Sequence, residues 1–553
     1  MGTTWAGLGQ LGLLLAALAI CHQPLGDHLA RVFTSTKHWA VERWIYRVVR
    51  VDPDSDQRWT TYGYSILGFS FVGVALLYLL QRIQPALPLA FGHAAVVPGM
   101  AFNTAVSFVT NTNWQSYVPE QTLGSAVPML GLTVQNFLSG AVGIAVAIAL
   151  IRGFVRAGTD RLGNAWVDIV RATVRVLLPI AFLFAIVLIG LGVVQSLRSG
   201  VAVTGVDGAR HTLTLYPAAG EESIKELGTN GGGIYNANSA HPFENPDGWS
   251  NLIEIFLELV IPVSLTRTFG VLVGDRKQGY TLLSVMAVIW GLMLTLIWWA
   301  ESHPTGRAAL LAGGAMEGKE VRFGIPGTSL FADATTSTST GAVNAAHDSL
   351  SGLGGGGALL NMMFGELTPG GAGTGIYGIL VVAVVAVFLA GLMVGRTPEY
   401  LGKKLGKVEV TVASVAVLAM PTLVLVLSGL AIALPSTAGA MNNSGAHGFT
   451  EVLYAYTSAA NNNGSAFAGI TVTSDFFQST LGIAMLLGRF VPIVAVLCLA
   501  GSLAGQRRTA ATSGTLVTTG PLFATLVGCT IVLVAAIVFV PALALGPIAE
   551  AVS

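Results

Sequence analysis

Charged residues are scarce in this chain of 553 residues: Asp, Glu, Lys and Arg make up 10% of it, against roughly 25% in soluble domains. Its 28 basic and 28 acidic residues balance, which excludes the basic surface expected of a nucleic-acid-binding protein. With 53% hydrophobic residues and a mean hydropathy of +0.69, the chain is expected to be a polytopic membrane protein within the lipid bilayer.

Cysteine is also rare, and its placement excludes several chemistries. Cys21, Cys498 and Cys529 lie in or beside apolar runs, without a CxxC motif or a cluster of histidines. We expect buried, inert thiols rather than a metal or redox centre, and no cofactor on this chain.

Long apolar runs dominate the sequence. A membrane-spanning helix needs about 20 predominantly apolar residues. Because the N-terminus has no basic region, we expect the first run to be an uncleaved span rather than a signal peptide. Ten segments meet the length requirement: residues 4–22, 61–82, 127–152, 174–197, 250–274, 280–300, 373–395, 412–434, 484–505 and 524–546.

Lys and Arg are distributed unevenly between the loops. Alternate loops are basic, as in Arg31–Arg50, Arg152–Arg175, Lys403–Lys407 and Arg507–Arg508. The loops between them differ, since residues 435–481 contain no Lys or Arg. Cytoplasmic loops of membrane proteins are enriched in Lys and Arg, so both termini are expected to lie outside.

The outer loops contain a repeated polar element rich in Thr, Ser, Asn and Gly. Such polar segments at membrane depth are tolerated only where protein or a water-filled cavity surrounds them. Short half-helices precede at least two of them, at Gly220–Gly228 and at Thr450–Ala460, with Thr450 as the expected N-cap. The four elements are FVTNTNWQSY (Phe108–Tyr117), LGTNGGGIYNANSAHPFENP (Leu227–Pro246), STSTGAVNAAHDS (Ser337–Ser349) and TSAANNNGSAFAG (Thr457–Gly469).

Neutral oxygen atoms are what these elements can offer. Glycine permits backbone torsions that turn successive carbonyl groups to one side, and potassium channels build filters from four such strands. Sites for Ca²⁺ or Mg²⁺ would use carboxylates, and none lies in the four cores. The pattern predicts a path for a monovalent cation. The alternative is four ordinary surface turns, and the regular spacing between spans argues against it.

At TNTNWQSYVPEQT, GTNGGGIYNANSAHPFENP and NNNGSAFAG the chain resembles KdpA, the A-subunit family of the bacterial Kdp P-type potassium-transporting ATPases. The resemblance runs nearly end to end. It implies an all-α fold with four pseudosymmetric helix–pore loop–helix repeats around a filter like that of K⁺ channels, plus one helix at each end. It also implies a bacterial plasma membrane, K⁺ as the transported ion, and an ATP-hydrolysing B subunit with C and F subunits as partners.

The resemblance implies which residues form the potassium filter. In the first repeat, Thr112 is expected where the others have glycine, and Gln115 is expected to brace that strand. The filter residues would be Thr110, Asn111, Thr112, Asn113, Thr229, Asn230, Gly231, Ser339, Thr340, Gly341, Asn462, Asn463 and Gly464.

Other polar residues are candidates for the ion path or its support. Gly365–Gly373 should interrupt an inner helix as a gating loop with Glu366 as its charge; the alternative is a solvated external loop. Arg489 should need a carboxylate or carbonyl partner and could bar the straight path to the cytoplasm, or serve only as a structural ion pair. We expect Glu254 and Glu258 to pair near the outer interface. His241, His347 and Asp348 are expected to support the filter motifs.

The expected organisation divides the chain into six parts. The chain lacks the DKTG phosphorylation motif of P-type ATPases, so it is expected to be a non-catalytic subunit that selects K⁺ and delivers it to the ATP-hydrolysing chain. A Trk/Ktr-like passive or gradient-driven transporter is the alternative. The parts are a first helix and loop (1–60), repeat 1 (61–152), repeat 2 (174–274), repeat 3 with the gating loop (280–396), repeat 4 (412–505) and a final helix (524–553).

Overall fold

The computed structural model describes residues 2–303, 315–395, 397–510 and 515–552. The predicted domain limits at 1, 396 and 553 lie outside the described residues. Ten helices within these ranges are long and apolar enough to cross a membrane, which confirms the predicted number. Each overlaps one of the ten predicted segments.

A helix, a short helix, a polar element and a second helix follow one another four times. The first repeat has α3 (Trp59–Arg82), α4 (Pro98–Val109) and α6 (Thr133–Val155). The second has α7 (Ala165–Arg171) and α8 (Leu178–Gly190), joined by a π-helical turn, then α9 (Ala218–Leu227) and α10 (Gly248–Leu272). The third has α11 (Arg276–Ser302), α13 (Gly324–Ser337), α14 (Gly352–Met363) and α15 (Thr374–Val394), and the fourth has α16 (Lys407–Ala433), α17 (Gly445–Asn461) and α18 (Asp475–Gly505).

The remaining elements flank these repeats or connect them. Helix α1 (Gly2–Thr34) precedes them, and α19 (Pro521–Leu545) and α20 (Pro547–Val552) follow them. In the part of the chain that the structure describes, the fold is all-α apart from three two-stranded sheets. The small elements are α2 (Ala40–Val48), α5 (Pro119–Thr122), β1 (Gln57–Arg58), β2 (Arg161–Gly163), β3 (Gly200–Thr204), β4 (Arg210–Thr214), β5 (Glu399–Tyr400) and β6 (Lys403–Lys404).

The second helix of each repeat forms the inside of the bundle. In α6 and α10, 83% and 78% of the most apolar window is buried, compared with 17% and 22% in α3 and α16. Large apolar side chains on the outer helices remain exposed, as expected of surfaces that face hydrocarbon. Four inner helices therefore surround the polar elements with protein.

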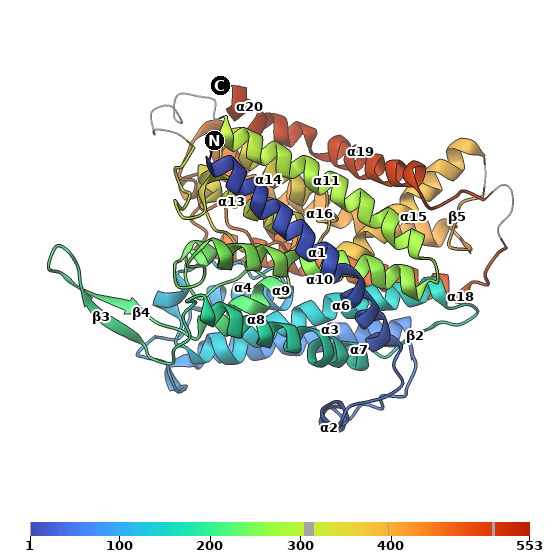
Figure 1. The fold of residues 1–553 in the computed structure, drawn as a ribbon, viewed down its shortest axis with the longest axis horizontal. Coiled ribbons are helices and arrows are strands. Elements are labelled where there is room, and N and C mark those ends of the chain that lie inside the picture. The colour runs from blue at the N-terminus through green and yellow to red at the C-terminus, as the bar shows by residue number, and fades with distance from the viewer. Residues whose placement is uncertain (1, 304–314, 396, 511–514, 553) are drawn as a thin grey trace.

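Both termini lie at the end of the bundle from which the β3–β4 hairpin projects (Figure 1). The basic loops, with α2, β2 and β5, lie at the opposite end. There, the Arg152 guanidinium binds both carboxylate oxygens of Asp168, and Lys403 donates to the carbonyl of Arg156 at 2.6 Å.

Several local expectations are wrong. Helix α1 extends to Thr34 rather than ending at residue 22, because its polar residues bind α10: Asp27 accepts from the Arg267 Nε at 2.7 Å. Helix α17 begins at Gly445 after Ser444, so Thr450 is not an N-cap; it lies within the helix and donates to the Ala446 carbonyl.

The cysteine prediction is also partly wrong. Cys21 and Cys498 are half-buried, but Cys529 is exposed on α19. This helix flanks the repeats and is only partly buried, so one side of it is left without a protein neighbour among the described residues.

Candidate functional site: four polar elements at the centre of the bundle

Each short helix ends at a polar element. Helices α4, α9, α13 and α17 end at Val109, Leu227, Ser337 and Asn461, and the backbone then becomes extended or left-handed. The C-terminus of a helix carries about half a negative charge. We refer to Thr110–Asn113, Thr229–Gly231, Ser339–Gly341 and Asn462–Gly464 as the first to fourth strands. Except for the partly exposed Gly464, their residues are buried.

The four strands touch in cyclic order. A β-carbon added to Gly231 of the second strand would lie 1.7 Å from the Thr340 carbonyl oxygen of the third. One added to Gly341 would lie 2.1 Å from the Asn463 oxygen of the fourth, and one on Gly464 would lie 1.7 Å from the Thr112 oxygen of the first.

The ring closes between the first and second strands. The Asn111 side-chain amide donates to the Thr229 carbonyl oxygen at 2.6 Å. A β-carbon on Gly232, just after the second strand, would lie 2.6 Å from the Asn113 carbonyl oxygen. Backbone oxygens of four separated segments are thus gathered around one centre at distances that leave no room for side chains.

Asn113 is the residue of the first strand that stands where the other three strands have glycine. The prediction that Thr112 holds this position is wrong. Gly231, Gly341 and Gly464 have φ between 76° and 96°, and Asn113 has φ of 59°. Asparagine tolerates this left-handed region, whereas a β-branched residue such as threonine does so poorly. Thr112 instead matches Thr340 and Asn463, and the carbonyl oxygen of each of these three residues faces the glycine of the preceding strand in the ring.

Side chains of the strands bind one another and the short helices. The hydroxyls of Thr110 and Thr112 lie 2.8 Å apart, and those of Thr338 and Thr340 lie 2.6 Å apart. The Asn463 amide donates to the carbonyls of Thr335 and Thr338 of the third repeat. The two bonds from Asn463 join the fourth strand to the third repeat, whereas the threonine contacts lie within one repeat.

Two polar residues of α6 complete this network and were not predicted. Ser139 donates to Asn111 Oδ1 at 2.7 Å and also lies 3.0 Å from the Asn230 amide. The Asn136 side chain accepts from the Asn113 amide at 2.5 Å. Polar residues within an otherwise apolar span were the available signal for this role.

Gln115 binds the segment that follows the second strand, whereas it was expected to brace the first. Its side-chain oxygen accepts from the Gly233 backbone N–H at 3.0 Å, and its amide donates to the Tyr117 hydroxyl. Gln115 also lines a depression of about 620 Å³, together with Val343, Ala466 and Asn236. This depression lies at the end of the strands that faces the same side of the bundle as the two chain termini.

The other end of the strands is covered by an interruption between α14 and α15, where a gating loop was predicted. Gly370 N–H donates to the Ser337 carbonyl at 3.0 Å, and Ala372 N–H donates to the Thr229 hydroxyl at 2.9 Å. Glu366 is 2% exposed, so the alternative of a solvated carboxylate is wrong. Neither of its carboxylate oxygens has a hydrogen-bond partner among the described residues.

Arg489 lies beside this interruption and is 3% exposed. It donates to the Ser139 carbonyl oxygen at 3.3 Å, so its predicted partner is a carbonyl and it does not extend to the membrane interface. Arg489, Glu366, Ser339 and Asn462 line a cavity of about 140 Å³ that continues between α15, α16 and α19.

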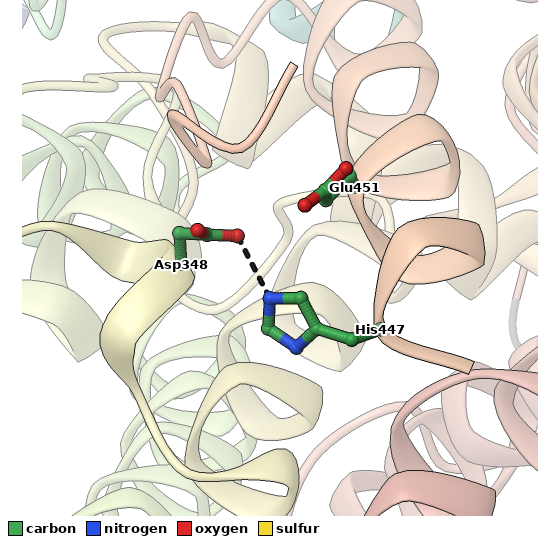
Figure 2. A group of neighbouring side chains, drawn as sticks. All are labelled: Asp348, His447 and Glu451. Carbon is green, nitrogen blue, oxygen red and sulfur yellow. Dashed lines mark hydrogen bonds and ion pairs between the residues drawn. The ribbon is translucent and has the colours of Figure 1, made fainter. Parts of the chain in front are cut away.

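The residues that flank the strands behave differently from one another. His347 is buried and binds the Tyr454 hydroxyl at 2.8 Å, and burial lowers its pKa to about 4. His241 stacks on Tyr235 with ring centroids 4.1 Å apart. Figure 2 shows Asp348 paired at 2.9 Å with His447 of α17, beside Glu451.

Glu254 and Glu258 do not pair near the outer interface as predicted. Both are fully buried in α10. They face the acidic residues of α9, Glu222 and Glu226. Packing of α9 against α10, which the sequence does not reveal, decides this arrangement.

A family model described as KdpA, potassium-transporting ATPase A subunit, matches residues 12–552. The chain belongs to the KdpA family. It is 59% identical to the potassium-transporting ATPase potassium-binding subunit of Mycobacteroides abscessus and 60% identical to that of Rhodococcus opacus, each comparison covering 99% of both chains.

Among solved structures, the chain resembles the potassium transporter TrkH from Vibrio parahaemolyticus. The TM-score is 0.51 at 14% identity, over 77% of this chain and 83% of that one. At this identity the likeness concerns the fold alone.

Proposed function

We propose that the four strands form the potassium filter of a KdpA subunit, which binds K⁺ and passes it to the ATP-hydrolysing subunit of its complex. The closed ring of strands supports this proposal, because Gly231, Gly341 and Gly464 each approach a carbonyl oxygen of the next strand. Carbonyl oxygens in such rings replace the hydration shell of K⁺. The C-terminal ends of four short helices add negative potential at the same centre.

Potassium enters the filter from the depression beside Gln115 and leaves it beside Glu366. The cavity below the strands supports a lateral exit, since it extends between α15, α16 and α19. The buried guanidinium of Arg489 opposes a straight passage of cations along the axis. The segment Gly365–Gly373 covers the lower end of the filter and acts as its gate.

The partners follow from family membership. A KdpA subunit works with an ATP-hydrolysing B subunit and with C and F subunits in a bacterial plasma membrane. The termini and the β3–β4 hairpin lie outside, and the basic loops with α2 lie in the cytoplasm, in agreement with the enrichment of Lys and Arg in cytoplasmic loops. K⁺ is the cargo, and this chain uses no cofactor.

The test is K⁺ uptake at micromolar concentration by potassium-depleted cells that express the whole complex. The variant is Gly231→Asp, because the new side chain would enter the space held by the Thr340 oxygen. The matched control is Gly439→Asp, at an exposed position where an added β-carbon meets no atom within 4 Å. Complex assembly is measured for both by size-exclusion chromatography.

We expect the Gly231 variant alone to lose apparent K⁺ affinity or discrimination against Rb⁺ while the complex still assembles. Unchanged uptake by an assembled Gly231→Asp complex would mean that the strands are structural turns. ATP-dependent uptake separates this function from that of a Trk/Ktr-like transporter, which works without ATP hydrolysis on a partner chain.

A further inference from the structure

A cluster of glutamates lies behind the second filter strand, between α9 and α10. Carboxylate oxygens of Glu222, Glu226 and Glu254 lie within 4.8 Å of one another, and Glu258 faces Glu226. Lys225 is the basic residue within this cluster. Its ammonium group lies 2.6 Å from Glu222 and 3.2 Å from Glu244.

The hydrogen bonds of the cluster are unevenly shared. Glu244 accepts from Lys225 and from the backbone N–H groups of Ile234 and Tyr235, and Glu222 accepts from Ser239 and pairs with Lys225. In contrast, neither oxygen of Glu254 or of Glu258 has a hydrogen-bond donor among the described residues.

Burial makes this arrangement incompatible with full ionisation. Glu254 and Glu258 are fully buried, and an isolated buried carboxylate costs several kcal/mol when no donor or cation compensates it. One ammonium group cannot neutralise five carboxylates, and neighbouring carboxylates disfavour one another's charge. A proton on each unpartnered carboxyl group removes the charge and supplies a donor to the neighbouring acid.

The cluster is connected to the filter through two hydrogen bonds. The Lys225 ammonium donates to the Asn238 side-chain oxygen at 3.0 Å, and the Asn238 amide donates to the Gly231 carbonyl oxygen at 2.7 Å. Helix α9, which bears Lys225, ends directly at the second strand. A change of charge among the glutamates is therefore transmitted to a filter carbonyl by contact and to a bound cation by its electric field.

We propose that Glu254 and Glu258 form a proton-binding site, each carrying a proton at neutral pH, and that their proton occupancy sets the K⁺ affinity of the filter. The link to affinity rests on the proposed filter function, whereas proton binding does not. Loss of protons at alkaline pH adds negative charge behind the second strand and tightens K⁺ binding. The groups facing the pair are Glu222, Lys225 and Glu226 of α9, with Glu244 beyond Lys225.

The variants are Glu254→Gln and Glu258→Gln, because glutamine matches the shape and neutrality of a protonated glutamate. The control is Glu317→Gln, at an exposed acid of an outer loop. Infrared spectroscopy of the purified complex, with H₂O/D₂O exchange, detects the carbonyl stretch of protonated carboxyl groups. The apparent KM for K⁺ is measured between neutral and alkaline pH.

We expect each Gln variant to assemble and to lose part of the protonated-carboxyl signal seen at neutral pH. The wild-type KM should fall by about 3-fold toward alkaline pH, and the double variant should show no such fall. The control should match wild type in both measurements. Normal assembly of the Gln variants together with loss of the infrared signal requires that Glu254 and Glu258 are protonated. Glutamine reproduces the charge of a protonated glutamate, whereas replacing an ionised glutamate would change the charge of the cluster.

Three outcomes would overturn the proposal: infrared signals unchanged by both substitutions, failure of both variants to assemble, or one divalent cation per complex that is lost in Glu254→Gln. An unchanged pH dependence of KM in the double variant would refute the link to K⁺ affinity. Failure of the filter assignment is recognised separately, by normal uptake in Gly231→Asp, and does not affect the infrared result.

Discussion

The carbonyl oxygen of Thr112 occupies the space where the β-carbon of residue 464 would lie: a β-carbon added to Gly464 would be 1.7 Å from it. The first and fourth strands, about 350 residues apart in the chain, can approach this closely only because Gly464 has no side chain. Its φ of 96° also disfavours any other residue.

Gly464→Ala should therefore weaken K⁺ binding by tenfold or more, about 1.4 kcal/mol, since the Thr112 carbonyl must move. The measurement is the K⁺ dependence of ATP hydrolysis by the purified complex. Gly439→Ala, in open surroundings, is the control and should leave the affinity unchanged. Equal affinities for both variants would contradict the ring.

The register of the first strand leads to a second prediction. Asn113→Gly should retain more K⁺ affinity than Asn113→Val, because a β-branched residue at φ of 59° costs about 1–3 kcal/mol. Asn113→Gly should also be milder than Thr112→Gly, which removes the hydroxyl that binds Thr110 and Asn462. The opposite order in K⁺ titrations would restore Thr112 as the glycine-equivalent residue.

Arg489→Gln should allow K⁺ to pass without ATP hydrolysis, because it removes the buried positive charge that, in the proposed function, opposes a straight passage of cations. The measurement is Rb⁺ flux into proteoliposomes that contain the complex but no ATP. Arg508→Gln, at an exposed residue of the basic loops, is the control. If the Arg489→Gln complex shows no Rb⁺ flux without ATP and normal ATP-driven uptake, Arg489 has only a structural role.

His447 should contribute pH-dependent stability. Hydrogen bonds to Asp348 and Glu550 raise its pKa to about 10 from 6.5. This stabilisation is fully present below pH 6.5, declines as the pH rises, and is lost above about pH 10. His447→Gln should cost about 2 kcal/mol at pH 6.5.

The check is thermal unfolding of wild type and His447→Gln at several pH values in this window. The difference in Tm should shrink as the pH approaches 10. His211→Gln, on the exposed β4 strand, controls for histidine loss in general. A difference that grows with pH would show that His447 is neutral in the folded protein.

The residues of the four strands could be predicted only in part from the sequence. The Thr, Asn and Gly elements could be located because each interrupts apolar sequence, and a strand that follows a half-helix can be recognised locally. The equivalence of Asn113 with the three glycines could not be predicted from the sequence, because asparagine indicates a positive φ less reliably than glycine does. Only contacts between strands reveal it.

The number of membrane-spanning segments, their approximate positions and the positions of the polar elements were determined by the sequence alone, because the length of an apolar run and the cost of polar groups in lipid are properties of the local chain. Tertiary structure decided which faces meet. It turned Glu254 and Glu258 toward α9, gave Arg489 the Ser139 carbonyl, and gave Gln115 a partner just after the second strand. These relationships join residues up to 350 positions apart. They depend on how the helices pack, which hydropathy does not determine, because the hydrophobic effect is non-directional and does not specify which helix faces meet.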